Sequence, residues 1–300
     1  RPLSLIASLL ALFLLSALAP AAEQSQPALR LITYNVYYGF TREPQRKPGF
    51  LAWMQQRKPD IVALQELNHY DAGQLADDAK EWGHKHSVLL KENGFPTGIT
   101  SRFPIEDVKR FREGFHHGLL RVRIRGLYVY VIHLHPSNWE VRTREVGLLL
   151  NNVDTLPPDV PVLLAGDFNT FSPKDRPAYA ESGLEQFFSA RDKKHNEKNL
   201  REGMLDYRVL ERVQAAKFVD LVARERDRTE GAFQATFPTR IAKTGTDGAP
   251  RRLDYVFANA HAAQRVLTAK VLIDPDAMIQ SDHLPVEVLF NGEGHPSHAP

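Results

Sequence analysis

PVLLAGDFNTFSP, at residues 161–173, is the stretch from which the rest of the chain is best interpreted. The apolar run at residues 162–165 is typical of a strand that is buried on both faces. Gly166 removes side-chain bulk, and Asp167 and Asn169 follow directly. If the strand continues, these two side chains point the same way, because strand side chains alternate. The alternative, with equal weight, is a strand end followed by an Asx turn, in which Asp and Asn bond to their own backbone.

Other predicted strands also end in polar side chains. Residues 28–35 (ALRLITYN) predict a first strand that ends in Asn35, and residues 60–67 (DIVALQEL) predict a second strand with Glu66 at its far end. A glutamate in such an apolar strand is not buried without a partner. Glu66 is therefore expected to lie at the rim of the sheet or to hold a cation.

Later strands complete this set of polar residues. His133 ends a strand in the middle of the chain, Asp254 lies in a strand near the C-terminus, and Asp282 and His283 precede the last strand. The whole set is Asn35, Glu66, His133, Asp167, Asn169, Asp254, Asp282 and His283. Carboxylates and carboxamides are hard oxygen donors that suit Mg²⁺ or Mn²⁺. A metal there can polarise a phosphoryl oxygen while a nearby carboxylate orients or deprotonates a water.

Composition places the chain among ordinary globular proteins. Of its 300 residues, 43% are hydrophobic and 25% are charged, and the formal net charge of +2 is too balanced to indicate a nucleic-acid or membrane partner by itself. No repeat or low-complexity linker divides it, so one domain is expected at residues 28–291. Helices are expected at residues 49–57, 71–82 and 140–153, and strands at 87–90, 97–101, 106–111, 118–124, 128–133, 253–257, 266–273 and 285–290.

The N-terminal residues 1–22 are predicted to be a signal peptide. An apolar stretch centred on LIASLLALFLL ends in the small residues ALAPAA, which favours cleavage after Ala21 or Ala22 and a periplasmic or secreted protein. An uncleaved anchor is the alternative, because a span of about 20 apolar residues can cross a bilayer. The absence of cysteine excludes thiol nucleophiles and thiolate metal sites. Residues 292–300 are expected to be a disordered tail.

A series of motifs resembles the endonuclease/exonuclease/phosphatase superfamily, which includes deoxyribonuclease-like enzymes. In the family's order, and across residues 29–290, they are YNVYYG, LQEL, GITSRFPI, IHLHP, GDFNTFSP, TFPT, RRLDYVF and SDHLPV. The resemblance implies an α/β (α+β) fold, a four-layer sandwich of two mixed β-sheets packed face to face and flanked by helices. It also implies a metal-dependent hydrolase of phosphoester bonds, with the active site at one end of the sandwich.

The resemblance assigns metal-binding roles to three residues. Asn35 and Glu66 match the family's metal-site positions, with Glu66 as the principal ligand, and Asp282 matches a carboxylate near the metal. The implied cofactor is Mg²⁺ or Mn²⁺.

Five other positions match the family's catalytic residues. Asp167 corresponds to the residue that activates the attacking water, and Asn169 to its partner beside the phosphate. His283 corresponds to the histidine that donates to the phosphate, and Asp254 to the carboxylate that holds it. His133 fits the family's second histidine. A protonated histidine stabilises charge that develops on phosphate oxygens.

The substrate is predicted only by class. A phosphodiester, either in nucleic acid or in a sphingomyelinase-like substrate, ranks ahead of a phosphomonoester such as an inositol or sugar phosphate. Tyr37 stands where many abasic-site enzymes carry an acidic or amide residue, which argues against abasic-site repair. A non-catalytic binding module on the same fold is the competing class, although none of the key residues is lost. No obligate protein partner is evident, and a monomer is expected.

Several side chains near these motifs have two interpretations. His135, and the pair His116 and His117, either touch substrate or serve the loops in which they lie, the latter being favoured. Tyr38 and Trp139 either form a stacking wall for substrate or pack against their neighbours. The charge-dense residues 191–228 either track phosphates or form an ordinary solvated face, and the mixture of signs favours the solvated face.

Overall fold

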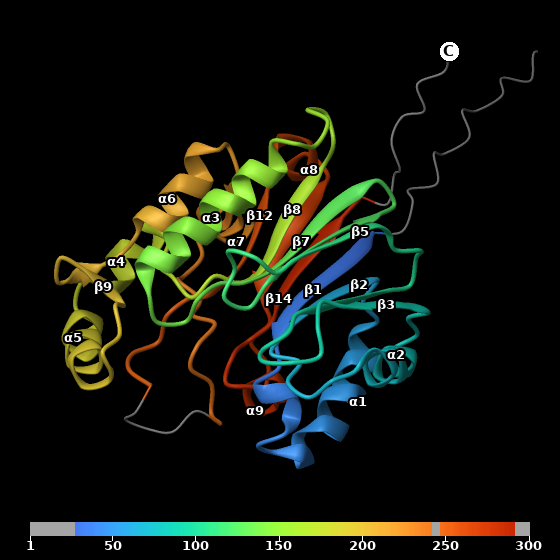
Figure 1. Cartoon of the computed structure of the whole chain (residues 1–300), viewed down its shortest axis with the longest axis horizontal. Coiled ribbons are helices and arrows are strands. Elements are labelled where there is room, and N and C mark those ends of the chain that lie inside the picture. Colours follow the sequence, from blue (N-terminus) through green and yellow to red (C-terminus); the bar gives the residue numbers. More distant parts are fainter. Residues whose placement is uncertain (1–27, 242–246, 292–300) are drawn as a thin grey trace, which may run out of the picture.

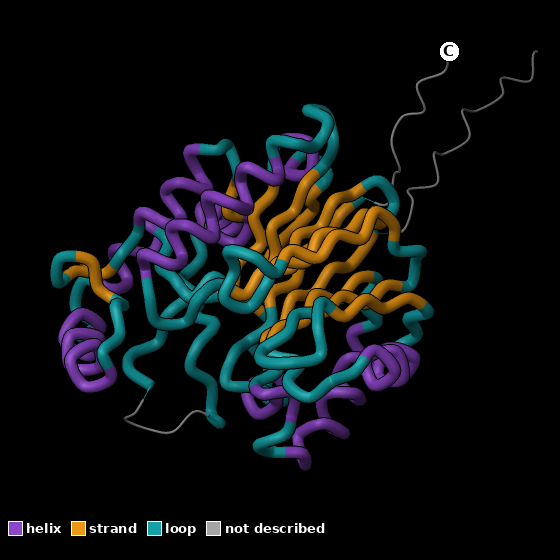
Figure 2. The backbone as a smooth tube through the Cα atoms, viewed as in Figure 1, coloured by secondary structure: helices purple, strands orange, loops and turns teal. Residues whose placement is uncertain are grey.

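The computed structural model describes residues 28–241 and 247–291. Two mixed six-stranded sheets form its centre (Figure 2). The first sheet has the order β13–β14–β1–β2–β4–β3, with β1 parallel to β2 and antiparallel to β14. Its strands are β1 (Leu29–Asn35), β2 (Ile61–Gln65), β3 (His86–Leu89), β4 (Gly98–Ser101), β13 (Val266–Val271) and β14 (Val286–Phe290).

The second sheet has the order β11–β12–β8–β7–β6–β5. Within it β7 is parallel to β8, whereas β12 is antiparallel to β8. Its strands are β5 (Glu106–Phe111), β6 (Leu119–Ile124), β7 (Leu127–His133), β8 (Val162–Asp167), β11 (Val219–Asp220) and β12 (Asp254–Ala258).

The two sheets pack face to face. Strands β1 and β2 contact β7 and β8, and the largest hydrophobic cluster includes Leu31 and Val62 from the first sheet with Val129 and Ala165 from the second. Apolar side chains therefore cover both central pairs on the inner face, and helices cover them on the outer face. Burial on both faces explains their nearly continuous apolar sequences.

Helices cover the outer faces and complete a four-layer sandwich (Figure 1). On the second sheet lie α3 (Trp139–Val153) and α6 (Arg208–Ala215), whose Val146, Leu149 and Leu210 pack on Tyr130 and Leu164. The first sheet is flanked by α1 (Lys47–Arg57), α2 (Ala72–Glu81) and the short α9 (Ala277–Gln280). Helix α7 (Leu221–Thr229) contacts β12 and β13, and α8 (Ala260–Ala263) contacts β8 and β12. The predicted fold class is confirmed.

Residues 173–207 form an arm beside the second sheet (Figure 1), and this arm includes the first part of the charge-dense residues 191–228. It contains α4 (Arg176–Tyr179), α5 (Leu184–His195) and a hairpin of β9 (Leu200–Arg201) and β10 (Met204–Leu205), around a separate small cluster that includes Phe171, Tyr179 and Phe188. Many of its charges pair within the same region, as Arg191 does with Glu197. This local pairing agrees with a solvated face.

The helix and strand predictions agree with the structure to within a few residues. Helix α2 lies inside the predicted range, and Asp71 caps it by accepting the Gln74 N–H at 2.7 Å. Strand β8 ends at Asp167, because Asn169 has a left-handed backbone with φ of 49°. Of the two alternatives for this segment, the structure has the Asx turn, in which Asp167 Oδ1 accepts the Asn169 N–H at 2.8 Å.

Gly166 is required by the close pairing of β7 and β8. Its φ is +144°, and a Cβ at this position would lie 2.0 Å from the carbonyl oxygen of Ile132. No side chain fits there without separating the two strands. The glycine therefore permits the close pairing that places Asp167 beside β7.

The predicted signal peptide and the predicted C-terminal tail lie outside the described residues. Among residues 28–241 and 247–291, no helix has the length and apolar character needed to cross a membrane.

Candidate active site

Three candidate residues stand side by side at one end of the second sheet. In the β7–β8 ladder His133 is opposite Asp167, and in the β8–β12 ladder Asp254 is opposite Asp167. Residues directly opposite in a ladder point to the same face. All three side chains are buried, at 3%, 1% and 1% exposure for His133, Asp167 and Asp254. The sheet itself therefore assembles this part of the site.

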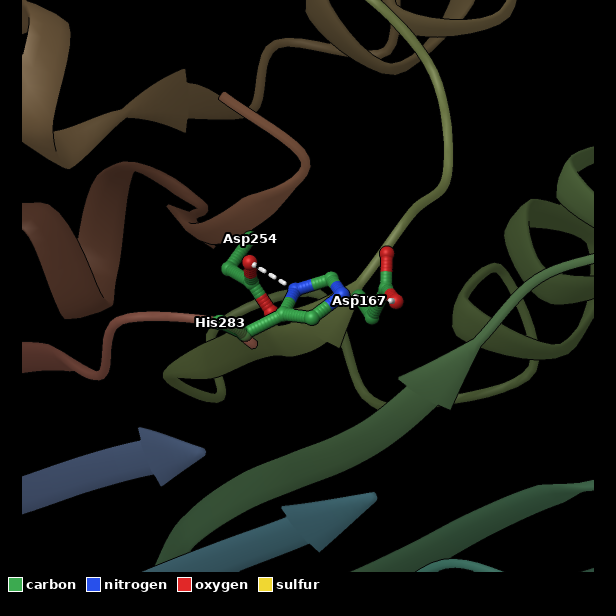
Figure 3. Close-up of side chains that lie close together, drawn as sticks. All are labelled: Asp167, Asp254 and His283. Atoms are coloured by element: carbon green, nitrogen blue, oxygen red, sulfur yellow. Dashed lines mark hydrogen bonds and ion pairs between the residues drawn. The ribbon is translucent and has the colours of Figure 1, made fainter. Parts of the chain in front are cut away.

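His283 reaches this row from the loop before β14. Its Nδ1 donates to Asp254 Oδ2 at 2.7 Å (Figure 3). Burial lowers the pKa of His283, but Asp254 and then Asp167 more than reverse this effect and raise the pKa to about 10. His283 is therefore an imidazolium at neutral pH. Its Nε2 faces Asp167 Oδ2 from 3.9 Å.

The TFPT motif holds this histidine–carboxylate pair together. The Thr236 hydroxyl accepts the backbone N–H groups of Leu253 and Asp254 at 2.9 and 3.1 Å, and the Thr236 carbonyl accepts the Leu284 N–H at 2.7 Å. The segment thus joins the strand that carries Asp254 to the loop that carries His283.

Asp167 lies at the centre of the site. Its Oδ2 accepts a hydrogen bond from Asn35 Nδ2 at 3.1 Å and lies 3.8 Å from His133 Nε2. Burial raises the pKa of Asp167 to about 7, although the neighbouring imidazolium of His283 lowers it. A carboxylate with a pKa near the working pH is suited to act as a general base. The Nε2 atoms of His133 and His283 lie 3.8 and 3.9 Å from Asp167 Oδ2, a distance that a water or a phosphate oxygen can bridge.

The first sheet supplies the remaining carboxylates. Glu66 follows β2 with a left-handed φ of 59°, and its Oε1 and Oε2 accept hydrogen bonds from Asn35 Nδ2 at 3.2 Å and from the Tyr38 N–H at 2.9 Å. The Oδ1 of Asn35 accepts the Tyr37 N–H at 3.1 Å. Asn35 therefore presents its donor side to both Glu66 and Asp167, and its role as a metal ligand stays a prediction.

The donor set fits a hard divalent cation. Burial and, to a smaller extent, the Glu66 carboxylate raise the pKa of Asp282 to about 7, although His283 lowers it. Repulsion among neighbouring carboxylates also raises the pKa of Asp167. One buried oxygen, Asp254 Oδ1, has no hydrogen-bond partner among the described residues. The buried carboxylates of Asp167 and Asp254 and the half-buried ones of Glu66 and Asp282 thus share one imidazolium, and a divalent cation would balance the remaining charge.

Asp167, Asp254 and His283 also form a group with metal-ligand spacing. One donor atom from each lies within 4.8 Å of the others. However, the 2.7 Å hydrogen bond occupies His283 Nδ1 and Asp254 Oδ2. Glu66 and Asp282 are therefore the stronger candidates to hold the metal.

The other predicted residues differ in how closely their side chains approach Asp167. His133 is neutral, because burial and then the charge of His283 lower its pKa to about 3. The Asn169 side chain donates to the Leu134 carbonyl at 3.1 Å and touches Asp167 only through its backbone N–H. His135 is half-buried, with its Nδ1 accepting the Ser137 N–H at 3.1 Å.

Glu145 is a supporting residue that the sequence analysis missed. It lies in α3 with 0% exposure, and its two oxygens accept the backbone N–H groups of His116 at 2.7 Å and His135 at 2.9 Å. It ties the loop before β6 to the loop after β7. Its position between apolar residues on the buried face of a predicted helix was the available signal, since Val146 and Leu149 flank it there.

Comparison with known proteins finds a matching family model and bacterial relatives. Residues 32–283 match the family model described as the Endonuclease/Exonuclease/phosphatase family. YbhP, an uncharacterized protein of Escherichia coli (strain K12), is 26% identical over 197 residues, covering 56% of this chain and 77% of that protein. An exodeoxyribonuclease of Bacillus subtilis (strain 168) is 23% identical over 272 residues, covering 88% of this chain and 100% of that protein.

Solved structures resemble the fold. An AP endonuclease from Archaeoglobus fulgidus superposes with a TM-score of 0.65 at 21% identity, covering 88% of this chain and 99% of that chain. The 3′ phosphatase NExo from Neisseria, bound to a product DNA hairpin, superposes with a TM-score of 0.61 at 19% identity and the same coverage.

Proposed function

The chain belongs to the endonuclease/exonuclease/phosphatase family of metal-dependent phosphoester hydrolases, and from this premise we propose that it is a Mg²⁺-dependent phosphodiesterase that cleaves nucleic acid. The observation that carries the proposal is the 2.7 Å contact between Asp254 and an imidazolium whose other nitrogen faces Asp167. This arrangement sets a base and a cationic donor on either side of one small space. A reacting phosphate needs both groups.

In the proposed reaction each side chain has one task. Asp167 takes a proton from the attacking water, and that proton is later returned to the leaving oxygen or to solvent. His283 keeps its proton and donates it in a hydrogen bond to a phosphate oxygen, while Asp254 holds the imidazole ring in place. Neutral His133 donates a second hydrogen bond. Glu66 and Asp282 would hold the divalent cation, which when bound polarises the phosphoryl group.

Nucleic acid is the preferred substrate for two reasons. The relative matched over its whole length is an exodeoxyribonuclease. An endonuclease and a DNA-bound phosphatase share the fold. A sphingomyelin-like phosphodiester and an inositol phosphate are the alternatives. We expect a monomer.

A panel assay tests this proposal. Purified protein is incubated with Mg²⁺, Mn²⁺ or EDTA and with DNA, RNA, sphingomyelin, inositol phosphates or bis-p-nitrophenyl phosphate, and Asp167→Asn is the inactive control. Cleavage of DNA or RNA that requires a divalent cation is the expected result. Hydrolysis of sphingomyelin or inositol phosphates without any nuclease activity would overturn the substrate assignment.

Export to the periplasm or the medium is proposed on the sequence of residues 1–22 alone. The mature protein is then expected to start after Ala21 or Ala22. Intact-mass measurement of exported protein tests this cleavage. Material that still carries residues before Ala19 would indicate a membrane anchor instead.

A further inference from the structure

Aromatic and imidazole rings from separate segments meet beside the active site. The Tyr38 ring, in η1 (Tyr38–Phe40), lies 5.1 Å from the Phe95 ring, which lies 5.3 Å from the His117 ring. His117 in turn stacks on His133 with 4.1 Å between ring centroids and 15° between ring planes. His116 lies 4.4 Å from His117. We call Tyr38, Phe95, His116 and His117 the aromatic rim.

The rim is fixed to the catalytic residues at both ends. At one end the Tyr38 N–H donates to Glu66. At the other end His117 stacks on His133, and Glu145 holds the backbone of His116. A ligand that touches the rim is therefore held at a defined position relative to the carboxylates.

The rim leaves ring surface for a ligand. His116 is exposed, and Tyr38 and Phe95 are half-buried, whereas His117 is buried and forms the base. The exposed guanidinium of Arg42 lies 3.5 Å over the centre of the Tyr38 ring and covers that face of it, so a ligand would stack on the neighbouring Phe95. The surface is thus aromatic and cationic.

We propose that the aromatic rim is a stacking subsite for a planar ring, specifically a nucleobase of the strand whose phosphodiester is cleaved. This inference rests on the proposed function and makes it narrower. Every base offers a π-face to aromatic side chains, and the phosphates that flank a base suit a neighbouring arginine. An alkyl chain would instead bury imidazole and guanidinium groups without hydrogen bonds, which is unfavourable.

Binding without metal tests the rim separately from catalysis. The probe is a single-stranded thymidine octamer, compared with an octamer of the same backbone in which tetrahydrofuran units replace the nucleosides, and both are measured by fluorescence anisotropy in EDTA. The wild-type protein should bind the base-bearing strand more tightly, by roughly five- to hundredfold, which is the usual range for stacking one base. Phe95→Leu should lose most of this preference, and Phe95→Trp should restore it.

Phe115→Leu is the matched control. Phe115 is a partly buried phenylalanine close to the rim in sequence, but it packs against the hydrophobic cluster under α3. This variant should keep the wild-type preference for bases. An equal affinity of the wild type for both strands, or an unchanged preference in Phe95→Leu, would overturn the subsite.

The same protein then reports on the proposed function. If the protein cleaves the octamer in Mg²⁺ but binds both strands equally in EDTA, the stacking subsite is wrong and the nuclease assignment stands. If the protein binds the base-bearing strand more tightly in EDTA but does not cleave it in Mg²⁺, the rim is a binding site and the nuclease assignment is wrong.

Discussion

The Asn35 carboxamide in one sheet donates to the Asp167 carboxylate in the other, with 3.1 Å between Nδ2 and Oδ2. The same Nδ2 lies 3.2 Å from Glu66 Oε1. Asn35 therefore places a neutral donor between two acidic groups that repel each other. Asn35 thereby connects Glu66, which would hold the metal, with Asp167, which would activate water.

Asn35→Ala should lower kcat/KM by about two orders of magnitude, which is the usual cost of losing one preorganised donor. The fold should remain intact, because the Asn35 backbone pairing with Gln65 does not need the side chain. Steady-state kinetics on bis-p-nitrophenyl phosphate and a thermal melt measure the two effects. The exposed Asn93→Ala is the control and should behave as wild type. Full activity of Asn35→Ala would show that the donor is dispensable.

Glu66→Gln should raise the Mg²⁺ concentration needed for half-maximal activity by at least about tenfold, because a neutral amide is a weaker ligand for a hard cation. Both Glu66 hydrogen bonds come from N–H donors, so one amide oxygen can still accept one of them. The thermal melt without metal should change little. A Mg²⁺ titration of activity is the measurement, with the exposed Glu92→Gln as control. Wild-type activity at low Mg²⁺ would refute the ligand assignment.

Asp254→Asn should shift the alkaline limb of the kcat/KM profile to lower pH. Asp254 is the largest favourable influence on the pKa of His283, which is about 10, so its loss lowers that pKa. In the proposed reaction activity requires the imidazolium, so it should fall as pH rises through this value. His283→Ala should lose about two to three orders of magnitude in kcat. An unshifted alkaline limb in Asp254→Asn would mean that the two residues are not coupled in catalysis.

His84 should make the fold sensitive to acid. Burial lowers its pKa to about 4, and its Nε2 donates to the Pro59 carbonyl at 2.8 Å while its Nδ1 accepts from Thr100. Between pH of about 6.5 and 4 the unfolded chain binds a proton that the folded protein does not, so stability falls as pH falls. The loss is on the order of 3 kcal/mol across that range.

Denaturant unfolding at pH 7 and pH 4.5 measures the contribution of His84. His84→Gln should be less stable than wild type at neutral pH, and its stability should change less between the two conditions. The exposed His69→Gln should retain the wild-type pH dependence. An identical pH dependence in wild type and His84→Gln would show that His84 is not the responsible group.

Much of the framework could be predicted from local sequence. Apolar runs bounded by Gly and Pro identify the central strands, and Asp71 and Asn138 mark the starts of α2 and α3 as capping residues. The meeting of Asp254 with His283 could be stated only through the family resemblance, because residues 29 apart in sequence carry no local signal of contact.

Other features of the site and of the fold could not be predicted, because they depend on contacts between residues distant in sequence. The direction of Asn169 could not be predicted, because its left-handed backbone and its bond to the Leu134 carbonyl are set by the neighbouring loop. Glu145 was missed because its partners are backbone groups of two loops. The arm at residues 173–207 lacks a periodic apolar pattern, since its small core is made of scattered aromatic and leucine side chains.

The position of β14 has a consequence for the order of events during synthesis. This strand is made after every other described strand, yet it lies between β1 and β13 and follows directly from the loop that carries His283. A nascent chain that still lacks residues 281–290 has an unpaired edge on β1 and no imidazolium beside Asp167. Hydrolytic activity should therefore begin only after β14 has left the ribosome and paired with β1, so an incomplete chain would not attack the phosphoesters of the cell that makes it.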